Sequence, residues 1–377
     1  MPQSALSQQA HDLLPAMLDA VEALVRVESP TEDDDACSAI AQEAIGIFEG
    51  LLPEPARVET HGGRPVWRWG LSRPRILLLG HLDTVWPVGS LARLPFSNDG
   101  EVLRGPGVFD MKAGIVQGWA ALTLAGVSEG SGVGMLLTTD EETGSHSSRD
   151  LIADAVTDAE AVLVLEPSVD GAMKTARKGT SWYTVDFQGR AAHAGLDPER
   201  GINALLAAAE FAGACGAWAD SSAGTTVTPT LLHAGTTSNT VPAAASLTLD
   251  VRAWTWAEQA RVDHAVRDWR PTVNAAGVVV LGGIDRAAME ESSSGSLFTL
   301  AQAAAATLGL PPLEGRAVGG ASDGNLTAAA GIATLDGLGA VGDGAHADHE
   351  WASVAAMAER AALLAALIDS LVRPATT

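Results

Sequence analysis

The amino-acid sequence predicts an α/β protein in which a smaller α+β domain is inserted into a larger one. Up to about residue 165, short apolar runs alternate with stretches of helical length, which is typical of a mostly parallel, mixed sheet flanked by helices. From about residue 180 strands with alternating polarity replace this rhythm, and it resumes after residue 292. We therefore expect residues 1–178 and 288–377 to form the larger domain and residues 179–287 the inserted domain.

In the larger domain, continuous apolar runs predict central strands that are buried on both faces. These runs are residues 75–80 (RILLLG), 132–139 (GVGMLLTT) and 161–165 (AVLVL). Residues 111–126 and 145–156 lie between them and have helical length and composition, so we expect crossover helices there. Residues 351–372 are expected to form a long closing helix whose apolar face packs on this domain.

The inserted segment has a different pattern. Residues 182–188 and 245–252 predict strands, with a helix over residues 201–218 between them. A second helix, over residues 255–270, precedes a strand at residues 277–281. Two passages of strand, helix and strand predict a small α+β sandwich.

Length and charge limit the classes of function. The chain has 377 residues, of which 47% are hydrophobic, so it can bury the cores of two domains. Its 46 Asp and Glu against 23 Lys and Arg give a net charge of −23. This charge repels phosphate backbones and anionic lipid surfaces, so we expect neither a nucleic-acid partner nor a membrane partner.

Targeting signals and cysteines add two further limits. The apolar stretch 204–219 is interrupted by Glu210 and is too short to cross a bilayer. The amino terminus has no basic segment before an unbroken apolar stretch, so we expect no secretion signal and a cytoplasmic protein. Cys37 and Cys215 lie far apart, outside any C-x-x-C motif, which excludes a disulfide framework and a cysteine zinc cage. Any metal must be bound by histidines and carboxylates.

Acidic and histidine side chains follow each of the three predicted central strands. His81 and Asp83 end the first, and residues two apart on an extended segment point the same way. Glu141 and Glu142 follow the second strand, and Glu166 follows the third. Open α/β sheets place their ligand sites at these strand ends, so we expect the side chains to converge.

Two more candidates lie in glycine-rich loops. Asp110 stands where a loop (GPGVFD) meets a predicted helix, and His346 lies in the loop before the closing helix. Each motif has a structural alternative: a turn role for Asp83, a helix N-cap for Asp110, and a solvated acidic loop for residues 140–142. Taken together, two histidines and several carboxylates predict a site for Zn²⁺, Co²⁺ or Mn²⁺. A carboxylate beside the ligands can act as a general base.

The sequence resembles the M20 family of metallopeptidases over nearly its whole length. The motifs GHLDTV, GVFDMKAG, TDEETGS, LEPS and GAHADHEW occur in the family's order and spacing. The resemblance implies a zinc-peptidase-like catalytic domain, an inserted dimerisation domain and two Zn²⁺ ions, with Co²⁺ or Mn²⁺ as alternatives. The implied ligands are His81, Asp110, Glu142, Glu166 and His346, with Asp110 bridging the two ions.

The resemblance also implies roles for the neighbouring residues. Asp83 would orient His81, and Glu141 would be the general base and acid. In the inserted domain His193 would reach the active site of a partner subunit in a homodimer and stabilise an oxyanion. Asn239 and Arg252 would contact substrate, with Arg252 binding a free α-carboxylate, and Gly320 would lie in a loop near that carboxylate. Without the resemblance, His193 would be read as a surface histidine, Asn239 as a turn asparagine and Arg252 as part of a surface ion pair.

The expected reaction is hydrolysis of a peptide or amide bond that releases a carboxyl-terminal amino acid, as in glutamate carboxypeptidases. An N-acyl-amino-acid deacylase is the alternative, and an inactive metal-binding homologue is a remote one.

Two other motifs indicate different functions. Ser322 in GASDG fits the nucleophile elbow of a serine hydrolase, and GLGAVG (residues 337–342) fits a dinucleotide-binding fingerprint. Both lack the strand or helix that their function requires.

Overall fold

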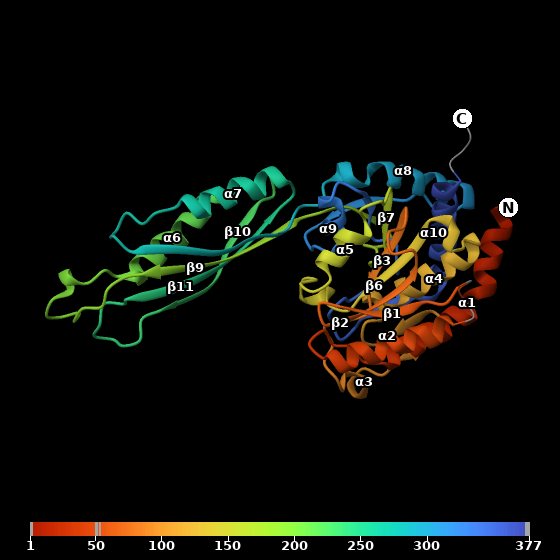
Figure 1. Cartoon of the computed structure of the whole chain (residues 1–377), viewed down its shortest axis with the longest axis horizontal. Coiled ribbons are helices and arrows are strands. Elements are labelled where there is room, and N and C mark those ends of the chain that lie inside the picture. Colours follow the sequence, from red (N-terminus) through yellow and green to blue (C-terminus); the bar gives the residue numbers. More distant parts are fainter. Residues whose placement is uncertain (1–2, 50–51, 53, 374–377) are drawn as a thin grey trace. The chain divides into compact units, whose positions relative to one another are not determined.

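The computed structural model of the chain describes residues 3–49, 52 and 54–373. Met1 and Pro2 lie outside the described residues. The chain divides into two compact units (Figure 1). The smaller unit consists of Arg177–Glu290 and Val318–Ala321, and the larger unit contains the rest. The sequence predicts residues 318–321 in the larger domain, whereas the structure groups Val318–Ala321 with the smaller unit, where Lys178 N donates a hydrogen bond to Val318 O (3.0 Å).

A six-stranded mixed sheet is the centre of the larger unit. Its strands, in spatial order, are β1 (Arg57–His61), β2 (Arg64–Gly70), β6 (Val133–Thr138), β3 (Ile76–His81), β7 (Ala161–Val164) and β14 (Ala333–Leu335). β6, β3, β7 and β14 run parallel, whereas β1 and β2 form an antiparallel hairpin at one edge. The predicted mostly parallel, mixed sheet is therefore confirmed.

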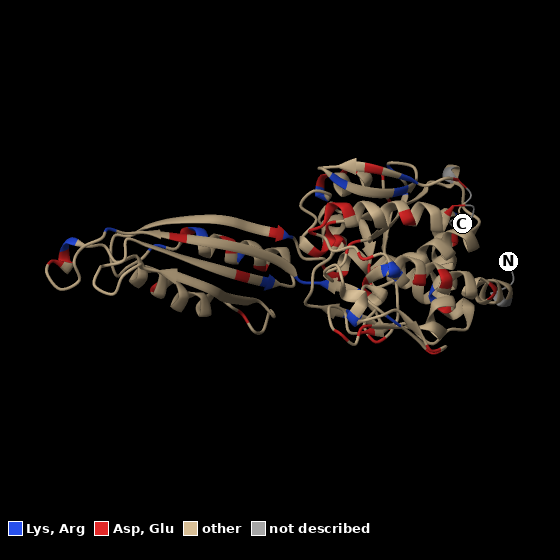
Figure 2. Ribbon diagram, turned by 90° about the horizontal axis from the view of Figure 1, so that it is seen from below, with Lys and Arg blue, Asp and Glu red and all other residues tan. Residues whose placement is uncertain are grey.

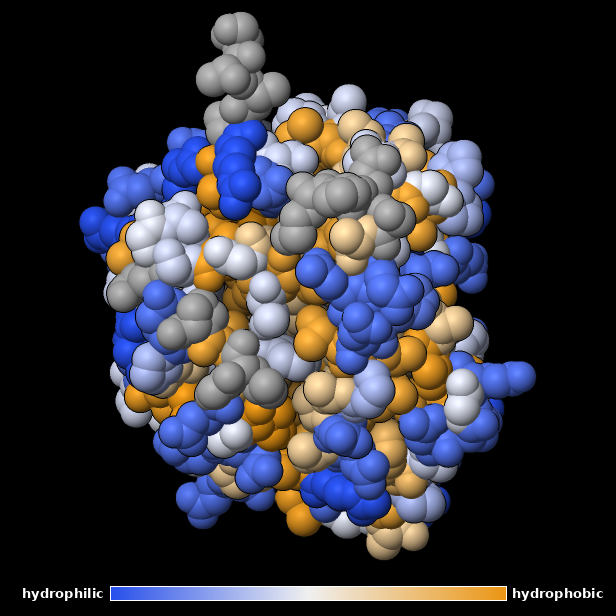
Figure 3. Space-filling view, turned by 90° about the vertical axis from the view of Figure 1, so that its right-hand side faces the viewer, coloured by the Kyte–Doolittle hydropathy of each residue, from blue (hydrophilic) through white to orange (hydrophobic). Residues whose placement is uncertain are grey.

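The central strands are apolar throughout because the sheet is covered on both faces. In β3, Ile76 and Leu78 belong to one hydrophobic core, and Leu77 and Leu79 belong to another on the opposite face. The helices over the first face are α1 (Gln3–Arg26), α2 (Asp34–Phe48), α4 (Ala113–Ala125), α8 (Glu291–Leu308) and α10 (Val354–Val372). Those over the second face are α5 (Arg149–Ala155) and α9 (Asp323–Ala329). Figure 3 views the side on which α1 and α10 lie, where hydrophobic side chains are interrupted by hydrophilic ones.

Short elements connect the loops of the larger unit. A small antiparallel sheet has the order β15 (Gly342–Asp343), β16 (Trp351–Ser353), β5 (Val102–Arg104) and β4 (Ser97–Asn98). Further short elements are β8 (Met173–Arg177), β13 (Gly315–Val318), α3 (Ser90–Arg93) and the turns Val108–Lys112, Glu129–Ser131 and Glu141–Thr143. The 3₁₀ turn Pro198–Arg200 lies in the smaller unit. Because β16 occupies residues 351–353, α10 begins three residues later than predicted, with Ser353 accepting the N-cap hydrogen bond from Ala356 N.

The smaller unit is a four-stranded antiparallel sheet with two helices. The strand order is β10 (Thr226–Ala234), β11 (Ala244–Ala253), β9 (Gly179–Gln188) and β12 (Gly277–Arg286), and the helices are α6 (Ala204–Trp218) and α7 (Trp256–Asp268). Tyr183, Val185 and Phe187 alternate along β9 and form the core with α6 and α7. The predicted α+β fold of this segment is confirmed, although β10 was not predicted.

The acidic residues that give the chain its net negative charge are distributed over both units (Figure 2). Figure 2 shows Asp and Glu spread over the elements of both units rather than collected in one tail. No helix in the described ranges has the length and apolar character that a membrane span requires.

Candidate metal centre

Three neighbouring parallel strands end at one edge of the central sheet and bring the predicted acids and histidine together. β3 ends in His81, which pairs in register with Thr138 at the end of β6. The next turn along the chain, Glu141–Thr143, carries Glu141 and Glu142, and Glu166 follows β7 by two residues. The carboxyl ends of parallel strands meet at one edge of the sheet, so these side chains converge there.

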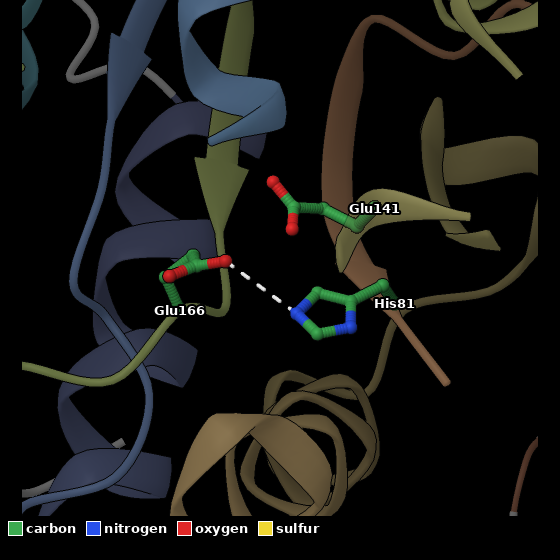
Figure 4. A group of neighbouring side chains, drawn as sticks. All are labelled: His81, Glu141 and Glu166. Atoms are coloured by element: carbon green, nitrogen blue, oxygen red, sulfur yellow. Dashed lines mark ion pairs between the residues drawn. The ribbon is translucent and has the colours of Figure 1, made fainter. Parts of the chain in front are cut away.

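Figure 4 shows the side chains of His81, Glu141 and Glu166 pointing into one shared space. One ligand atom from each lies within 4.8 Å of the others. His81 Nε2 is 3.6 Å from Glu166 Oε1. His81, Asp110 and Glu142 form a second group within the same limit.

Asp110 stands between the two histidines. Its Oδ1 is 3.3 Å from His81 Nε2, and its Oδ2 is 3.5 Å from His346 Nε2. His346 Nε2 is also 3.0 Å from Glu142 Oε2. The two oxygens of one carboxylate therefore face two different sets of nitrogen and oxygen donors.

The backbone around Asp110 excludes its interpretation as a helix N-cap. α4 begins at Ala113 with Lys112 as its N-cap residue, and Asp110 is extended (φ −114°, ψ 93°). The Asp110–Met111 peptide bond is cis. Gly114, in the first turn of α4, packs so closely on the residue after β7 that an added Cβ would lie 2.2 Å from Leu165 O. This approach places the Asp110 loop beside the residue that precedes Glu166.

Hydrogen bonds fix the orientation of His81. Its Nδ1 lies 3.0 Å from the backbone oxygen of Asp83, which can only accept, so Nδ1 carries the proton and Nε2 faces the carboxylates. Asp83 Oδ1 is 3.4 Å from the same nitrogen. The other oxygen of Asp83 accepts hydrogen bonds from Thr31 Oγ1 (2.7 Å) and from Glu142 N (3.1 Å). Asp83 is therefore a buried link between His81 and the turn that carries Glu142.

The clustered carboxylates create a negative potential that favours a bound positive charge. Burial by itself lowers the pKa of His81, but the carboxylates around it, Asp110 first among them, raise that pKa well above its ordinary value. Asp110 and Glu142 raise the pKa of His346 to about 10. Burial raises the pKa of Glu142 to about 7. When carboxylates lie this close together, their negative charge favours protonation of the neighbouring histidines and carboxyl groups. Bound cations would compensate that charge instead.

Several buried atoms of the cluster fit the role of metal ligands. His81 Nε2, Asp110 Oδ1 and Glu142 Oε1 are buried and have no hydrogen-bond partner among the described residues. Buried polar atoms without partners are rare and costly, and a bound cation would satisfy them. The donors are imidazole nitrogens and carboxylate oxygens, the set that suits Zn²⁺, Co²⁺ and Mn²⁺.

Sequence reasoning missed three residues that contact this cluster. Thr31 hydrogen-bonds to Asp83, and Lys174 Nζ is 3.4 Å from Glu166 Oε2. Glu350 hydrogen-bonds to the backbone of the Asp110 loop. None carries a local sequence signal, because each contacts a segment that lies at another position in the chain.

The remaining predicted site residues lie in the smaller unit. Asn239 O accepts a hydrogen bond from Ala194 N (2.9 Å), so the structure brings Asn239 next to His193. Arg252, on β11, forms an ion pair with Asp250 (2.8 Å). Gly320 O accepts a hydrogen bond from Arg177 Nη1 (3.0 Å).

The two competing motifs have structural roles. Ser322 is the N-cap residue of α9, and its Oγ accepts from Gly324 N and donates to Asp336 Oδ2 (2.7 Å). The GLGAVG segment leads into β15 and not into a helix. Neither arrangement provides a nucleophile elbow or a dinucleotide site.

Comparisons with known proteins agree with this geometry. The family model "Peptidase family M20/M25/M40" matches residues 77–370. Carboxypeptidase G2 from Pseudomonas sp. (strain RS-16) is 31% identical over 392 residues, which cover 98% of this chain and 92% of that protein.

Two solved structures share the fold. Aminopeptidase PepT from Bacillus cereus has a TM-score of 0.75 and 21% identity, covering 95% of this chain and 98% of that one. The Bacillus subtilis YXEP protein, described as a dinuclear metal binding peptidase, has a TM-score of 0.67 and 13% identity, covering 96% and 99%. The chain therefore belongs to the M20/M25/M40 peptidase family and is a hydrolase.

Proposed function

We propose that the protein is a carboxypeptidase that uses two divalent metal ions to hydrolyse the amide bond before a carboxyl-terminal amino acid. The observation that carries this proposal is the position of Asp110, whose two oxygens face His81 and His346 separately. His81, Asp110 and Glu166 would hold one ion, and Asp110, Glu142 and His346 the other. The likeness to carboxypeptidase G2 supports the choice of reaction.

Two bound Zn²⁺ ions would supply Lewis acidity to the scissile carbonyl and to water. Glu141 is the proposed general base and acid, because its carboxylate lies in the same group as His81 and Glu166. It takes the proton from the attacking water and passes it to the departing nitrogen. Asp83 holds the Nδ1–H tautomer of His81 through its backbone oxygen, which leaves Nε2 available as a ligand.

His193 is the proposed donor to the oxyanion. Its Nδ1 accepts hydrogen bonds from the backbone nitrogens of Gly195 and Leu196, both at 3.1 Å. A neutral imidazole with an accepting Nδ1 carries its proton on Nε2. His193 is exposed, so Nε2–H can donate to the negative oxygen of a substrate outside this loop.

Arg252 is the proposed partner of the substrate α-carboxylate. Its Nε and Nη2 donate to the two oxygens of Asp250 at 2.9 and 2.8 Å, which fixes the plane of the guanidinium. Nη1 has no hydrogen-bond partner among the described residues, and a planar fork of donors suits a carboxylate. Asn239 and the loop at Gly320 are proposed as further substrate contacts.

A homodimer is part of the proposal. The segment with His193 and Asn239 adjoins the start of β11 at Ala244, whereas Arg252 lies near its end. Eight residues of extended strand span about 26 Å. This separation supports the proposal that the His193 and the Arg252 that serve one substrate come from different protomers. Activity that stays with a monomer at assay concentration would contradict this arrangement.

The substrate class is tested with a panel of dipeptides and N-acyl amino acids, each with a free and an amidated carboxyl end. A carboxypeptidase cleaves the free acids and discriminates among acyl groups. Equal cleavage of all acyl groups would instead favour an N-acyl-amino-acid deacylase. Equal cleavage of the amidated substrates would exclude recognition of the α-carboxylate.

A further inference from the structure

The carboxylate of Glu350 is buried and accepts four hydrogen bonds. Glu350 is 4% exposed. Its Oε2 accepts from the indole Nε1 of Trp86 and from Gly107 N, both at 2.9 Å. Its Oε1 accepts from Phe109 N (2.9 Å) and Asp110 N (3.0 Å). Both oxygens are thus fully used within the fold.

These bonds connect the segments that carry the candidate ligands. Trp86 lies in the loop after β3, the strand that ends in His81. Residues 107–110 form the loop that ends in Asp110, and Glu350 itself follows His346 by four residues. One carboxylate therefore joins three loops, and each of these loops adjoins a different candidate ligand.

The choice of a carboxylate here has an electrostatic cost. A buried negative charge is unfavourable unless several hydrogen-bond donors compensate it. Burial accordingly raises the pKa of Glu350. Only an ionised carboxylate accepts from three backbone N–H groups and an indole at once, since an amide has a single accepting oxygen. The donor set therefore selects Glu at this position.

We propose that Glu350 is a positioning residue that fixes the backbone of Asp110, so that the Asp110 carboxylate stands between His81 and His346. In this role Glu350 sets the affinity of the centre for both metal ions. The inference rests on the dinuclear site of the proposed function.

The test compares Glu350→Gln with Glu28→Gln. Glu28 is a matched control because its two oxygens accept from Gly89 N and Leu91 N, both at 2.7 Å, at α3, where no candidate ligand lies. The measurements are Zn²⁺ affinity by competition with a chromophoric chelator, the visible spectrum of the Co²⁺ form, and thermal unfolding of the metal-free protein. E350Q should bind both ions about 10- to 100-fold more weakly and have an altered Co²⁺ spectrum. E28Q should lower only the unfolding temperature.

Wild-type affinity and an unchanged spectrum in folded E350Q would overturn the inference. Equal weakening in E28Q and E350Q would also overturn it, since it would reduce Glu350 to a general stabilising role. If E350Q does not fold, Glu350→Asp is the second variant, because it keeps the charge but shortens the side chain by one methylene. E350D should bind both ions more weakly than the wild type. Wild-type affinity in E350D would contradict the inference. Wild-type protein that binds fewer than two ions would contradict the proposed function itself, and the inference with it.

Discussion

Glu141→Gln separates proton transfer from metal binding. Glu141 and Glu142 are adjacent on the turn after β6, yet they have different neighbours. Glu142 Oε2 contacts His346 Nε2 at 3.0 Å, whereas Glu141 groups with His81 and Glu166. The amide of Gln preserves the shape of the side chain but cannot accept a proton from water.

The expected loss is that of a general base. Such steps contribute about 10²- to 10⁴-fold, which corresponds to about 2.7–5.4 kcal/mol of activation free energy. The metal content of E141Q should equal that of the wild type, because the proposed ligands are unchanged. The assay measures kcat on the best peptide substrate, with metal analysis of the same preparation.

Glu142→Gln is the control for this experiment. It removes a proposed ligand from the same turn, so it should lose metal and activity together. Near-normal kcat in E141Q would remove Glu141 from the mechanism. Loss of metal from E141Q with retention in E142Q would show that the two roles are reversed.

Three further predictions concern other parts of the chain. Arg252→Ala should lower kcat/KM about 10- to 100-fold for substrates with a free carboxylate and not for amidated ones, because it removes charged hydrogen bonds; an unchanged kcat/KM for the free acids would refute the anchoring role. Gly114→Ala should cost about 1–3 kcal/mol of stability, because its Cβ would lie 2.2 Å from Leu165 O; an unaltered thermal unfolding temperature would contradict this packing. Burial raises the pKa of Cys37 and of Cys215 to about 12, so at pH 8 both thiols stay protonated and should react with a disulfide reagent only after denaturation; rapid reaction of the native protein would contradict their burial.

The central strands and the candidate ligands could be predicted because their signals are local. β3, β6 and β7 are buried on both faces, so their apolar runs stand out from the rest of the chain. The candidate ligands His81, Glu142 and Glu166 lie at or just after the ends of these strands, and parallel topology brings the strand ends together. Asp110 and His346 lie in loops, where glycine-rich motifs mark them.

Other features could not be predicted from local patterns. β10 contains Pro229, which argues against a strand, and the structure accommodates it at the sheet edge beside a register shift. The strands of the small antiparallel sheet are two or three residues long, too short for a periodicity. The role of Glu350 depends on the backbone of Gly107, 243 residues earlier, and no single-sequence pattern reports such a contact.

The most direct test of the proposed dinuclear centre is the metal content of protein purified without added metal or chelator. The cluster brings together five carboxylates and two imidazoles, and Asp110 faces both histidines. We expect close to two equivalents of divalent metal per chain, and loss of activity when they are removed. At most one equivalent in a fully active preparation would contradict the assignment of two metal ions to this site.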